Sequence, residues 1–250
     1  MKTIILAGGF GSRLEEITKL IPKPMVRIQK LPILVHVMKI FIKFNHTEFV
    51  IALGYKGEKI VEYFLGRKPN KQIKKKLNQG FTIKNKISNK NCTITLINTG
   101  LNSLTGGRVK RASRLINDNE NFFLTYGDGV ANINLNNLLK QHKKNKKLVT
   151  VTAVNPPARF GELKIKGKKV ISFSEKKAIQ QSWINGGFFV MDKKFVKLIK
   201  NDNSILERDP LEKATKLGQL EAYKHRGFWQ CMDTKRDKDI LELALKKNRK

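Results

Sequence analysis

Short apolar runs rich in β-branched residues alternate with amphipathic helical stretches through residues 1–155. Such runs are typical of strands buried on both faces, and strands separated by helices form parallel sheets. The pattern predicts an α/β fold with a doubly wound, mostly parallel, Rossmann-like sheet. The expected strands are Thr3 to Ala7, Phe49 to Leu53, Thr93 to Asn98, Phe122 to Tyr126 and Leu148 to Val154. Each ends near Gly, Asn or Asp, and such sheets place ligands at these strand ends.

The clearest helical stretch follows Pro32, a residue that can open a helix at its first position. Apolar side chains recur there at the spacing of one buried helix face: Leu34, Val37, Met38 and Phe41. We expect this helix to belong to the core, with His36 in a packing or surface role. The other histidines lack metal-ligand spacing, and the same roles are expected for His46, His142 and His225.

Beyond residue 155 the pattern becomes mixed. Gly161 to Ile165 and Val170 to Ser174 flank a Lys-Gly-Lys-Lys turn, which predicts a hairpin. A further strand is expected at Ile184 to Met191. It is followed by a helix at about Ile205 to Leu217, a strand at Leu220 to Tyr223 and a helix at about Thr234 to Lys247. No change in composition marks a second domain, so we expect a single domain over residues 1–250, with halves of about 1–155 and about 156–250.

Lysine and arginine outnumber aspartate and glutamate by 51 to 20, which gives a formal net charge of +31. This excess by itself suggests a polyanionic partner such as nucleic acid. The basic residues are scattered along the chain, however, and aromatic residues are not interleaved with them as stacking platforms. We therefore expect no nucleic-acid partner, although the positive field would attract small phosphorylated anions.

The cysteines and the apolar segments indicate in which cellular compartment the protein is expected. Cys92 and Cys231 are isolated, without CxxC spacing, so they predict no disulfide framework and favour a reducing compartment. The opening apolar stretch is too short for a signal peptide, and the longest later one, Ile33 to Phe44, is interrupted by histidine and lysine. These features predict a cytoplasmic protein without a membrane segment.

The first expected strand runs directly into a glycine-rich turn at 8–13, with the sequence GGFGSR. Glycine lets backbone N–H groups turn toward an anion, so this turn can cradle a triphosphate. Its spacing matches neither GxGxxG nor GxxxxGK[ST], which disfavours a dehydrogenase or a P-loop ATPase. A tight turn of an α/β fold explains the turn alone equally well.

Two aspartates are candidate metal ligands. Asp128 stands between two glycines at the end of an expected strand, where it could hold Mg²⁺ or close an Asx-turn. Asp233 immediately precedes the last expected helix, and from the residues alone a helix N-cap is the stronger interpretation.

Two strings together carry a family resemblance: LAGGFGSRL at 6–14, and IPKPMV at 21–26, in which a lysine stands between two residues of fixed φ. They resemble the signature of the sugar-1-phosphate nucleotidyltransferases. The resemblance implies that Arg13 and Lys23 grip the nucleotide phosphates, and that Asp128 and Asp233 share a Mg²⁺ ion. In such chemistry a sugar phosphate oxygen attacks the nucleotide directly, so no Ser, Cys or His nucleophile is needed.

Further strings, in collinear order over nearly the whole chain, resemble the glucose-1-phosphate cytidylyltransferase branch of this family. They are SLTGGRVKR at 103–111, TYGDGVAN at 125–132, PPARFGEL at 156–163, INGGFFV at 184–190 and GFWQCMDT at 227–234. The resemblance implies that the first half binds CTP and the second binds α-D-glucose 1-phosphate, and that the products are CDP-glucose and pyrophosphate.

The same resemblance assigns individual residues. The residues that it implies bind the nucleotide are Leu6, Ala7, Gly8, Gly9, Gly11, Ser12, Arg13, Lys23, Ser103, Thr105, Arg108 and Asp128. Ser103, Thr105 and Arg108 would hold the pyrimidine, although Arg108 taken alone also fits a helix-opening surface charge. The residues that the resemblance implies bind the sugar phosphate are Gly161, Glu175, Lys176 and Asn185. The glutamate would contact a glucose hydroxyl and the lysine the attacking phosphate. Arg13, Lys23 and Lys176 would be the catalytic set.

Three positions depart from the family's pattern: Lys177 and Cys231 stand where relatives commonly have proline, and Ser12 stands where many have threonine, which keeps the hydroxyl. Two alternatives to the specific activity also stay open. One is a uridylyl- or thymidylyltransferase acting on a hexose 1-phosphate, and the other is a non-catalytic relative that binds sugar nucleotides. The resemblance further implies a homo-oligomer, a hexamer in many relatives, and a place in O-antigen and lipopolysaccharide biosynthesis.

Overall fold

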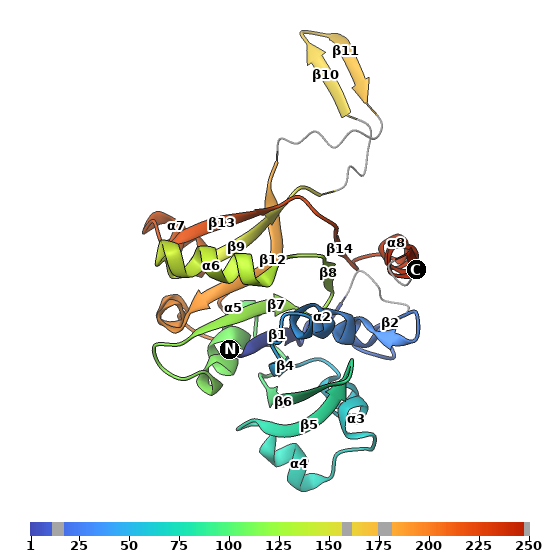
Figure 1. Ribbon diagram of the computed structural model, residues 1–250, viewed down its shortest axis with the longest axis vertical. Helices are drawn as coiled ribbons and strands as arrows, with labels where there is room; N and C mark the ends of the chain where they lie inside the picture. Colours follow the sequence, from blue (N-terminus) through green and yellow to red (C-terminus); the bar gives the residue numbers. More distant parts are fainter. Residues whose placement is uncertain (12–17, 157–161, 175–181, 248–250) are drawn as a thin grey trace.

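The computed structural model describes residues 1–11, 18–156, 162–174 and 182–247, and its centre is an eight-stranded sheet (Figure 1). The strand order is β13-β9-β12-β7-β1-β4-β6-β5. The strands are β1 (Thr3–Ala7), β4 (Glu48–Leu53), β5 (Phe81–Ile87), β6 (Lys90–Asn98), β7 (Asn121–Tyr126), β9 (Val149–Val154), β12 (Ile184–Asp192) and β13 (Leu220–His225). Figure 1 shows the sheet from β13, near the top of the body, to β5 near its foot.

Parallel pairing dominates the middle of this sheet. β1 lies between β4 and β7 and runs parallel to both, and β4 runs parallel to β6. All five residues of β1 are buried, which explains why the strand is a continuous apolar run instead of an alternating one. The mostly parallel Rossmann-like sheet is therefore confirmed, with its strands within a few residues of the predicted positions.

Antiparallel strands enter at two places. β12 is inserted between β7 and β9 and runs antiparallel to both, so the sheet of the second half is mixed, as predicted. β5 was not predicted, and it pairs antiparallel with β6. Ser88 and Asn89 join these strands with φ of 49° and 61°, which is the left-handed geometry of a two-residue hairpin turn.

Helices cover both faces of the sheet. They are α2 (Ile33–Ile42), α3 (Gly57–Leu65), α4 (Lys71–Lys76) and α6 (Leu135–Asn145) on one face, and α5 (Thr105–Ala112) and α7 (Asp209–Lys216) on the other. A further helix, α8 (Lys235–Lys247), packs instead against the short strands β14 (Trp229–Cys231) and β2 (Arg27–Ile28). Alternate residues of β1 reach opposite faces: Ile5 packs in the cluster that holds α2, α3 and α6, whereas Ile4 packs in the cluster that holds α5 and α7. The molecule is thus a three-layer α/β structure.

The predicted core helix is α2, which begins one residue after Pro32, so that the proline is its N-cap instead of its first residue. His36 is buried on it, and its Nε2 lies 3.0 Å from the carbonyl oxygen of Ile28. The packing role expected for this histidine is confirmed. α7 is shorter than predicted, because Pro210 takes a first-turn position and the helix begins at Asp209.

Shorter elements complete the chain. They are a 3₁₀ turn at Lys23–Met25, β2 (Arg27–Ile28) paired with β3 (Leu31–Pro32), β8 (Gly129–Ala131) paired with β14 (Trp229–Cys231), and 3₁₀ turns at Ser113–Leu115 and Lys193–Leu198. The predicted hairpin forms as β10 (Glu162–Lys166) and β11 (Lys169–Ser174), which lie apart from the body in Figure 1. Among the described helices, none has both the length and the apolar character that crossing a bilayer requires.

Candidate active site

The glycine-rich turn leaves β1 at the edge of the sheet where the parallel strands β4 and β7 also end. Gly127 N donates to Leu6 O at 3.0 Å and Tyr55 N donates to Gly8 O at 3.1 Å, so the turn is held on both sides. A Cβ at Gly8 would lie 2.4 Å from Arg108 Nη1, and only glycine fits there. Gly11 has a φ of +68°, a conformation that also favours glycine.

A cavity of about 320 Å³ opens over this turn. Ten of the residues predicted to bind nucleotide line it: Leu6, Ala7, Gly8, Gly9, Gly11, Lys23, Ser103, Thr105, Arg108 and Asp128. Ser12 and Arg13 lie outside the described residues. These ten residues come from four separate stretches of sequence, and the structure places them around one cavity.

Arg108 is buried, with 4% of its surface exposed, so the alternative of a surface charge is wrong. Its guanidinium donates to Leu53 O at 3.2 Å, to Thr99 Oγ1 at 2.9 Å, to Gly100 O at 2.7 Å and to Leu101 O at 3.0 Å. Burial, together with nearby Arg111, lowers the pKa of Arg108 from its usual value. Arg108 thus ties the end of β4 to the loop that follows β6; direct contact with the base stays a prediction.

The loop residues next to Arg108 are held by residues from the second half of the chain. The Thr105 hydroxyl donates to Glu207 Oε2 at 2.7 Å and accepts from Leu206 N at 2.9 Å. Leu104 N donates to Asp202 O at 2.8 Å, and Ser103 is buried between these anchored residues. The loop before α5 is therefore positioned by residues 202–207, which no motif had indicated.

Asp128 and Asp233, far apart in sequence, are neighbours because β8 pairs with β14. Gly129 is the register partner of Cys231, and Met232 N donates to Asp128 O at 2.9 Å. The Lys23 Nζ lies 2.6 Å from Asp128 Oδ2 and 2.7 Å from Asp233 Oδ1. Both carboxylates thus face one shared cationic group, beside the glycine-rich turn.

The charge of Lys23 is stabilised by this arrangement. Burial of the ammonium opposes its charge, but the Coulombic attraction and hydrogen bonds of Asp128 and Asp233 outweigh that cost and raise its pKa above the usual range. Since the pKa is raised, Lys23 keeps its proton throughout neutral and moderately alkaline pH.

The helix cap that the sequence suggested for Asp233 belongs instead to Thr234. Asp237 N donates to Thr234 Oγ1 at 3.2 Å, as in a capping box at the start of α8. The Asp237 carboxylate accepts from Asp233 N at 3.1 Å and from Thr234 N at 2.8 Å, and its other oxygen accepts from Gln230 Nε2 at 3.0 Å. Buried Asp237 therefore fixes the turn from which Asp233 projects.

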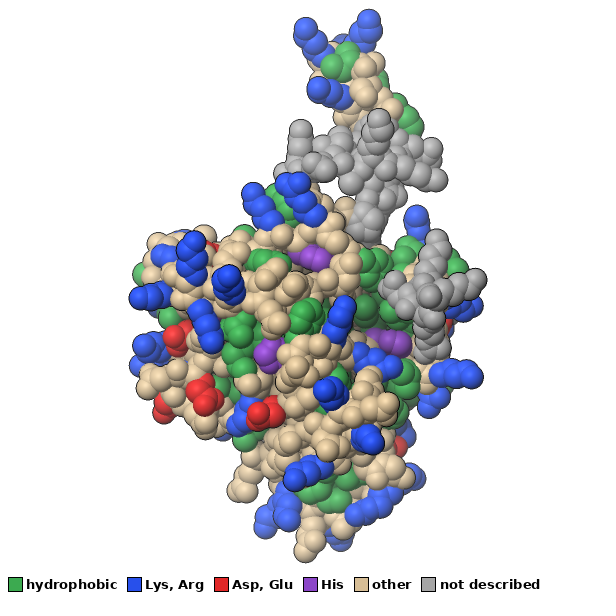
Figure 2. Space-filling model, in the orientation of Figure 1, with side chains coloured by type: hydrophobic (Ala, Val, Ile, Leu, Met, Phe, Trp, Pro, Cys, Tyr) green, Lys and Arg blue, Asp and Glu red, His purple; other side chains and the backbone are tan. Residues whose placement is uncertain are grey.

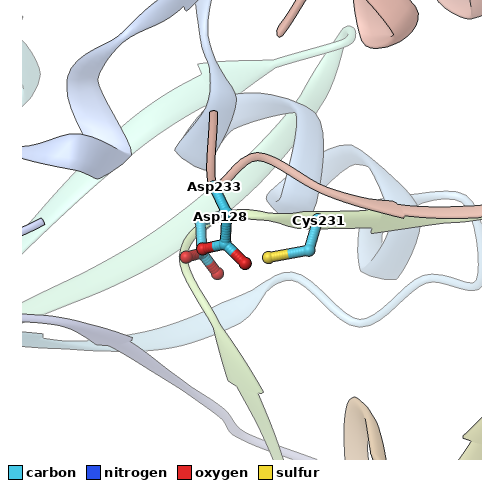
Figure 3. A group of neighbouring side chains, drawn as sticks. All are labelled: Asp128, Cys231 and Asp233. Atoms are coloured by element: carbon cyan, nitrogen blue, oxygen red, sulfur yellow. The ribbon is translucent and has the colours of Figure 1, made fainter. Parts of the chain in front are cut away.

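Cys231 stands next to the two aspartates. One donor atom from each of Asp128, Cys231 and Asp233 can be chosen so that all three lie within 4.8 Å of one another (Figure 3). Burial raises the pKa of the Cys231 thiol, and the nearby Asp128 and Asp233 carboxylates raise it further. The carboxylates suit a hard divalent cation such as Mg²⁺, and their convergence on the Lys23 ammonium shows that they can serve one cation together.

A second cavity, of about 570 Å³, adjoins the first. Tyr126 and Asp128 line both cavities. Asn185, predicted for the sugar phosphate, lines the second cavity together with Asp233. Gly161, Glu175 and Lys176, predicted for the same site, lie outside the described residues.

Comparison with known proteins identifies the family. The family model for nucleotidyl transferases matches residues 2–246. The chain belongs to the nucleotidyl transferase family. It is 43% identical over 245 residues to the glucose-1-phosphate cytidylyltransferase of Salmonella typhimurium, covering 97% of this chain and 95% of that one. It is 41% identical to the probable glucose-1-phosphate cytidylyltransferase of Bacillus subtilis, covering 97% of this chain and 94% of that one.

Solved structures agree on the fold of this nucleotidyl transferase. HddC from Yersinia pseudotuberculosis superimposes with a TM-score of 0.73 over 98% of this chain and 99% of that one, at 23% sequence identity. At this identity the likeness concerns the fold alone.

Three residues of the nucleotidyl transferase site were missed by sequence reasoning. Tyr126 donates its hydroxyl proton to Glu207, and burial, reinforced by the Glu207 charge, raises the pKa of Tyr126 well above its usual value. Trp229 Nε1 donates to Gly186 O at 2.7 Å, and both residues line the second cavity. Tyr126 and Trp229 stand within the strings TYGDGVAN and GFWQ, where a polar aromatic could have been singled out. Nothing local marks Glu207.

Proposed function

We propose that this nucleotidyl transferase transfers CMP from CTP to α-D-glucose 1-phosphate, giving CDP-glucose and pyrophosphate, and that it uses Mg²⁺. The supporting observation is the meeting of Lys23, Asp128 and Asp233 at the junction of two cavities, beside a glycine-rich turn. The specific substrates are supported by relatives 41–43% identical over 97% of the chain, which are named as glucose-1-phosphate cytidylyltransferases.

The two cavities give the reactants separate places. CTP would lie over the glycine-rich turn in the first cavity, and the sugar phosphate would lie in the second, against Asn185 and Trp229. Since Asp128 lines both, the attacking phosphate oxygen and the α-phosphorus would meet beside it. The chain then contributes mainly by holding the two reactants in line, which can account for much of the rate of a phosphoryl transfer.

Charge neutralisation is the second contribution of the chain. Lys23, which stays charged, would pair with phosphate oxygens of the nucleotide when the substrate enters, and Arg13 would neutralise the leaving pyrophosphate. Lys176 would hold the attacking phosphate and Glu175 a glucose hydroxyl, with Gly161 and Asn185 completing the sugar site. Bound Mg²⁺ would supply further positive charge to the phosphates from its place on Asp128 and Asp233.

The base would lie against the loop that Arg108 and Glu207 hold in place. The buried hydroxyl of Ser103 and the backbone groups of this loop can hydrogen-bond to the donor and acceptor groups of cytosine and so distinguish it from other bases. We also propose that the enzyme is a homo-oligomer in the cytoplasm and supplies sugar nucleotides for surface polysaccharide synthesis such as that of O-antigen.

The test is pyrophosphate release measured with CTP, UTP and dTTP, each crossed with several hexose 1-phosphates in the presence of Mg²⁺. The expected result is the highest kcat/KM for CTP with α-D-glucose 1-phosphate. An equal kcat/KM for UTP or dTTP would contradict the base assignment. Binding of CDP-glucose without release from any pair would favour the non-catalytic alternative.

A further inference from the structure

We propose that Cys231 extends the acidic pair into a three-donor site for a thiophilic divalent cation such as Zn²⁺, Cd²⁺ or Co²⁺. Such an ion would occupy Asp128 and Asp233 and so exclude Mg²⁺. The binding of the ion does not depend on the proposed function; only the inhibition that it would cause depends on it.

The spacing of the donors fits one ion. Zn²⁺ lies about 2.0–2.3 Å from carboxylate and thiolate ligands, so two donors of a tetrahedral site lie about 3.3–3.8 Å apart. Donor atoms of Asp128, Cys231 and Asp233 all lie within 4.8 Å of one another, so side-chain movements of about 1 Å bring them to the spacing that one ion needs. Figure 3 shows the Cys231 sulfur and the two carboxylates directed into the same space.

The backbone holds the three donors in place. Cys231 ends β14, whose pairing with β8 positions it opposite Gly129, the residue after Asp128. Asp233 follows two residues later, on the turn that Asp237 fixes by accepting from Asp233 N and Thr234 N. Because the donors come from paired strands and an anchored turn, little conformational freedom is lost when an ion binds.

The two carboxylates already pair with a cationic group of the chain. The Lys23 ammonium contacts both carboxylates, at 2.6 and 2.7 Å, and would have to leave when a metal ion enters. A divalent ion brings twice the charge of the ammonium, and it can also bond the Cys231 sulfur, which the ammonium does not.

The chemistry of the third donor selects the metal. Soft thiolates favour Zn²⁺, Cd²⁺ and Co²⁺, whereas Mg²⁺ takes oxygen ligands almost exclusively. On binding, the sulfur–metal bond replaces the S–H bond, and the thiol proton passes to solvent without any oxidation or reduction. The same three residues therefore offer two aspartates to Mg²⁺ and a complete mixed set to a softer ion.

The test is a titration of the purified chain with Co²⁺, without nucleotide or sugar, followed by absorption spectroscopy. The matched variants are Cys231→Ser and Cys92→Ser, which remove the two cysteines of the chain one at a time. Cys92 lies near the beginning of β6, at the edge of the sheet opposite to the site. We expect a thiolate-to-cobalt charge-transfer band in the wild type and in Cys92→Ser, and its loss in Cys231→Ser.

A competition titration with Zn²⁺ gives the second readout. Loss of a supporting residue around a metal already costs about 10–100-fold in affinity, so loss of the Cys231 donor should weaken Zn²⁺ binding at least about tenfold. Cys231→Ala, checked for folding by circular dichroism, serves if the serine variant does not fold. A wild type without the charge-transfer band, a band that persists without Cys231, or unchanged Zn²⁺ affinity would overturn the proposal.

These outcomes are separable from those of the proposed function. If the cobalt titration fails, the result of the pyrophosphate assay still tests the proposed function. If that assay fails, the metal spectra still test the three-donor site. If both hold, the midpoint for Zn²⁺ inhibition of pyrophosphate release should rise at least about tenfold in Cys231→Ser relative to Cys92→Ser.

Discussion

The two cavities of the site are built in different ways. The walls of the first come from residues 6–11, 23–24, 102–108 and 126–128, all in the first half of the chain. The second draws on β7, β8, β12, Glu207 and the segment around β14, from both halves. The first is bounded mainly by loops at the ends of adjacent parallel strands, whereas the second exists only because β12 is inserted antiparallel beside β7.

This difference separates what each cavity needs in order to form. The first needs the loops after β1, β4 and β6, the buried Arg108 and the support that residues 202–207 give to the loop before α5. The second needs β12 beside β7 and the pairing of β8 with β14. Substitutions should therefore fall into three groups: those that affect both cavities, those that affect the first alone and those that affect the second alone.

The largest effect is expected where the cavities meet. Asp128→Asn and Asp233→Asn each remove a charge that faces the shared cation, and each should reduce kcat for pyrophosphate release by at least about 10³-fold. Thermal unfolding followed by circular dichroism should remain cooperative. Asp118→Asn, at a carboxylate with 94% of its side chain exposed, is the control and should leave kcat unchanged. Wild-type rates in both site variants would remove these aspartates from the metal site.

An intermediate effect, confined to the first cavity, is expected from Arg108→Lys. Lysine cannot reproduce the forked donation to four buried or half-buried acceptors, so the KM for CTP should rise about 10–100-fold and stability should fall by about 2–4 kcal/mol. The KM for the sugar phosphate should change much less.

Arg111→Lys is the matched control for this prediction. It lies on the same helix, α5, and its guanidinium pairs with Asp202 at a half-exposed position. Steady-state kinetics should show little change in either KM. If Arg108→Lys instead raised both KM values equally, the separation of the cavities would be wrong.

The smallest effect, confined to the second cavity, is expected from Trp229→Phe. The change removes the Nε1 donor to Gly186 O, a hydrogen bond that contributes about 1 kcal/mol, and so should raise the KM for the sugar phosphate about fivefold. The KM for CTP should not change. Trp183→Phe is the control, because Trp183 does not line the cavity and has Lys224 over its ring. A larger effect from Trp183 than from Trp229 would contradict the assignment of this wall.

Sequence reasoning succeeded where the physical cause is local. The strands β1, β4 and β7 were located because burial on both faces leaves apolar runs, and β6 and β9 because they are rich in β-branched residues. The glycine-rich turn was found because it follows directly from β1. β5 was missed because its inward residues alternate with exposed Thr82, Lys84 and Lys86, which in a lysine-rich chain resembles a solvated loop.

Sequence reasoning failed where the cause is distant. The helix cap is the exception, because its cause is local: Thr234 and Asp237 stand three residues apart, at the spacing of a capping box, so the residues alone could have favoured Thr234 over Asp233. Arg108 could not be placed in the interior, because its acceptors lie on loops that are brought together only by the sheet. Glu207 stands in no motif, yet it holds both Thr105 and Tyr126.

The order of strands also bears on solubility. The eight-stranded sheet ends at β5 on one side and β13 on the other, and an edge strand is a template on which a strand of another molecule can pair. Both edges carry exposed lysines: Lys84 and Lys86 on β5, and Lys224 on β13. Figure 2 shows lysine and arginine spread over the visible face in the same way. Part of the excess positive charge thus opposes edge-to-edge aggregation, a protection that should weaken as added salt screens it.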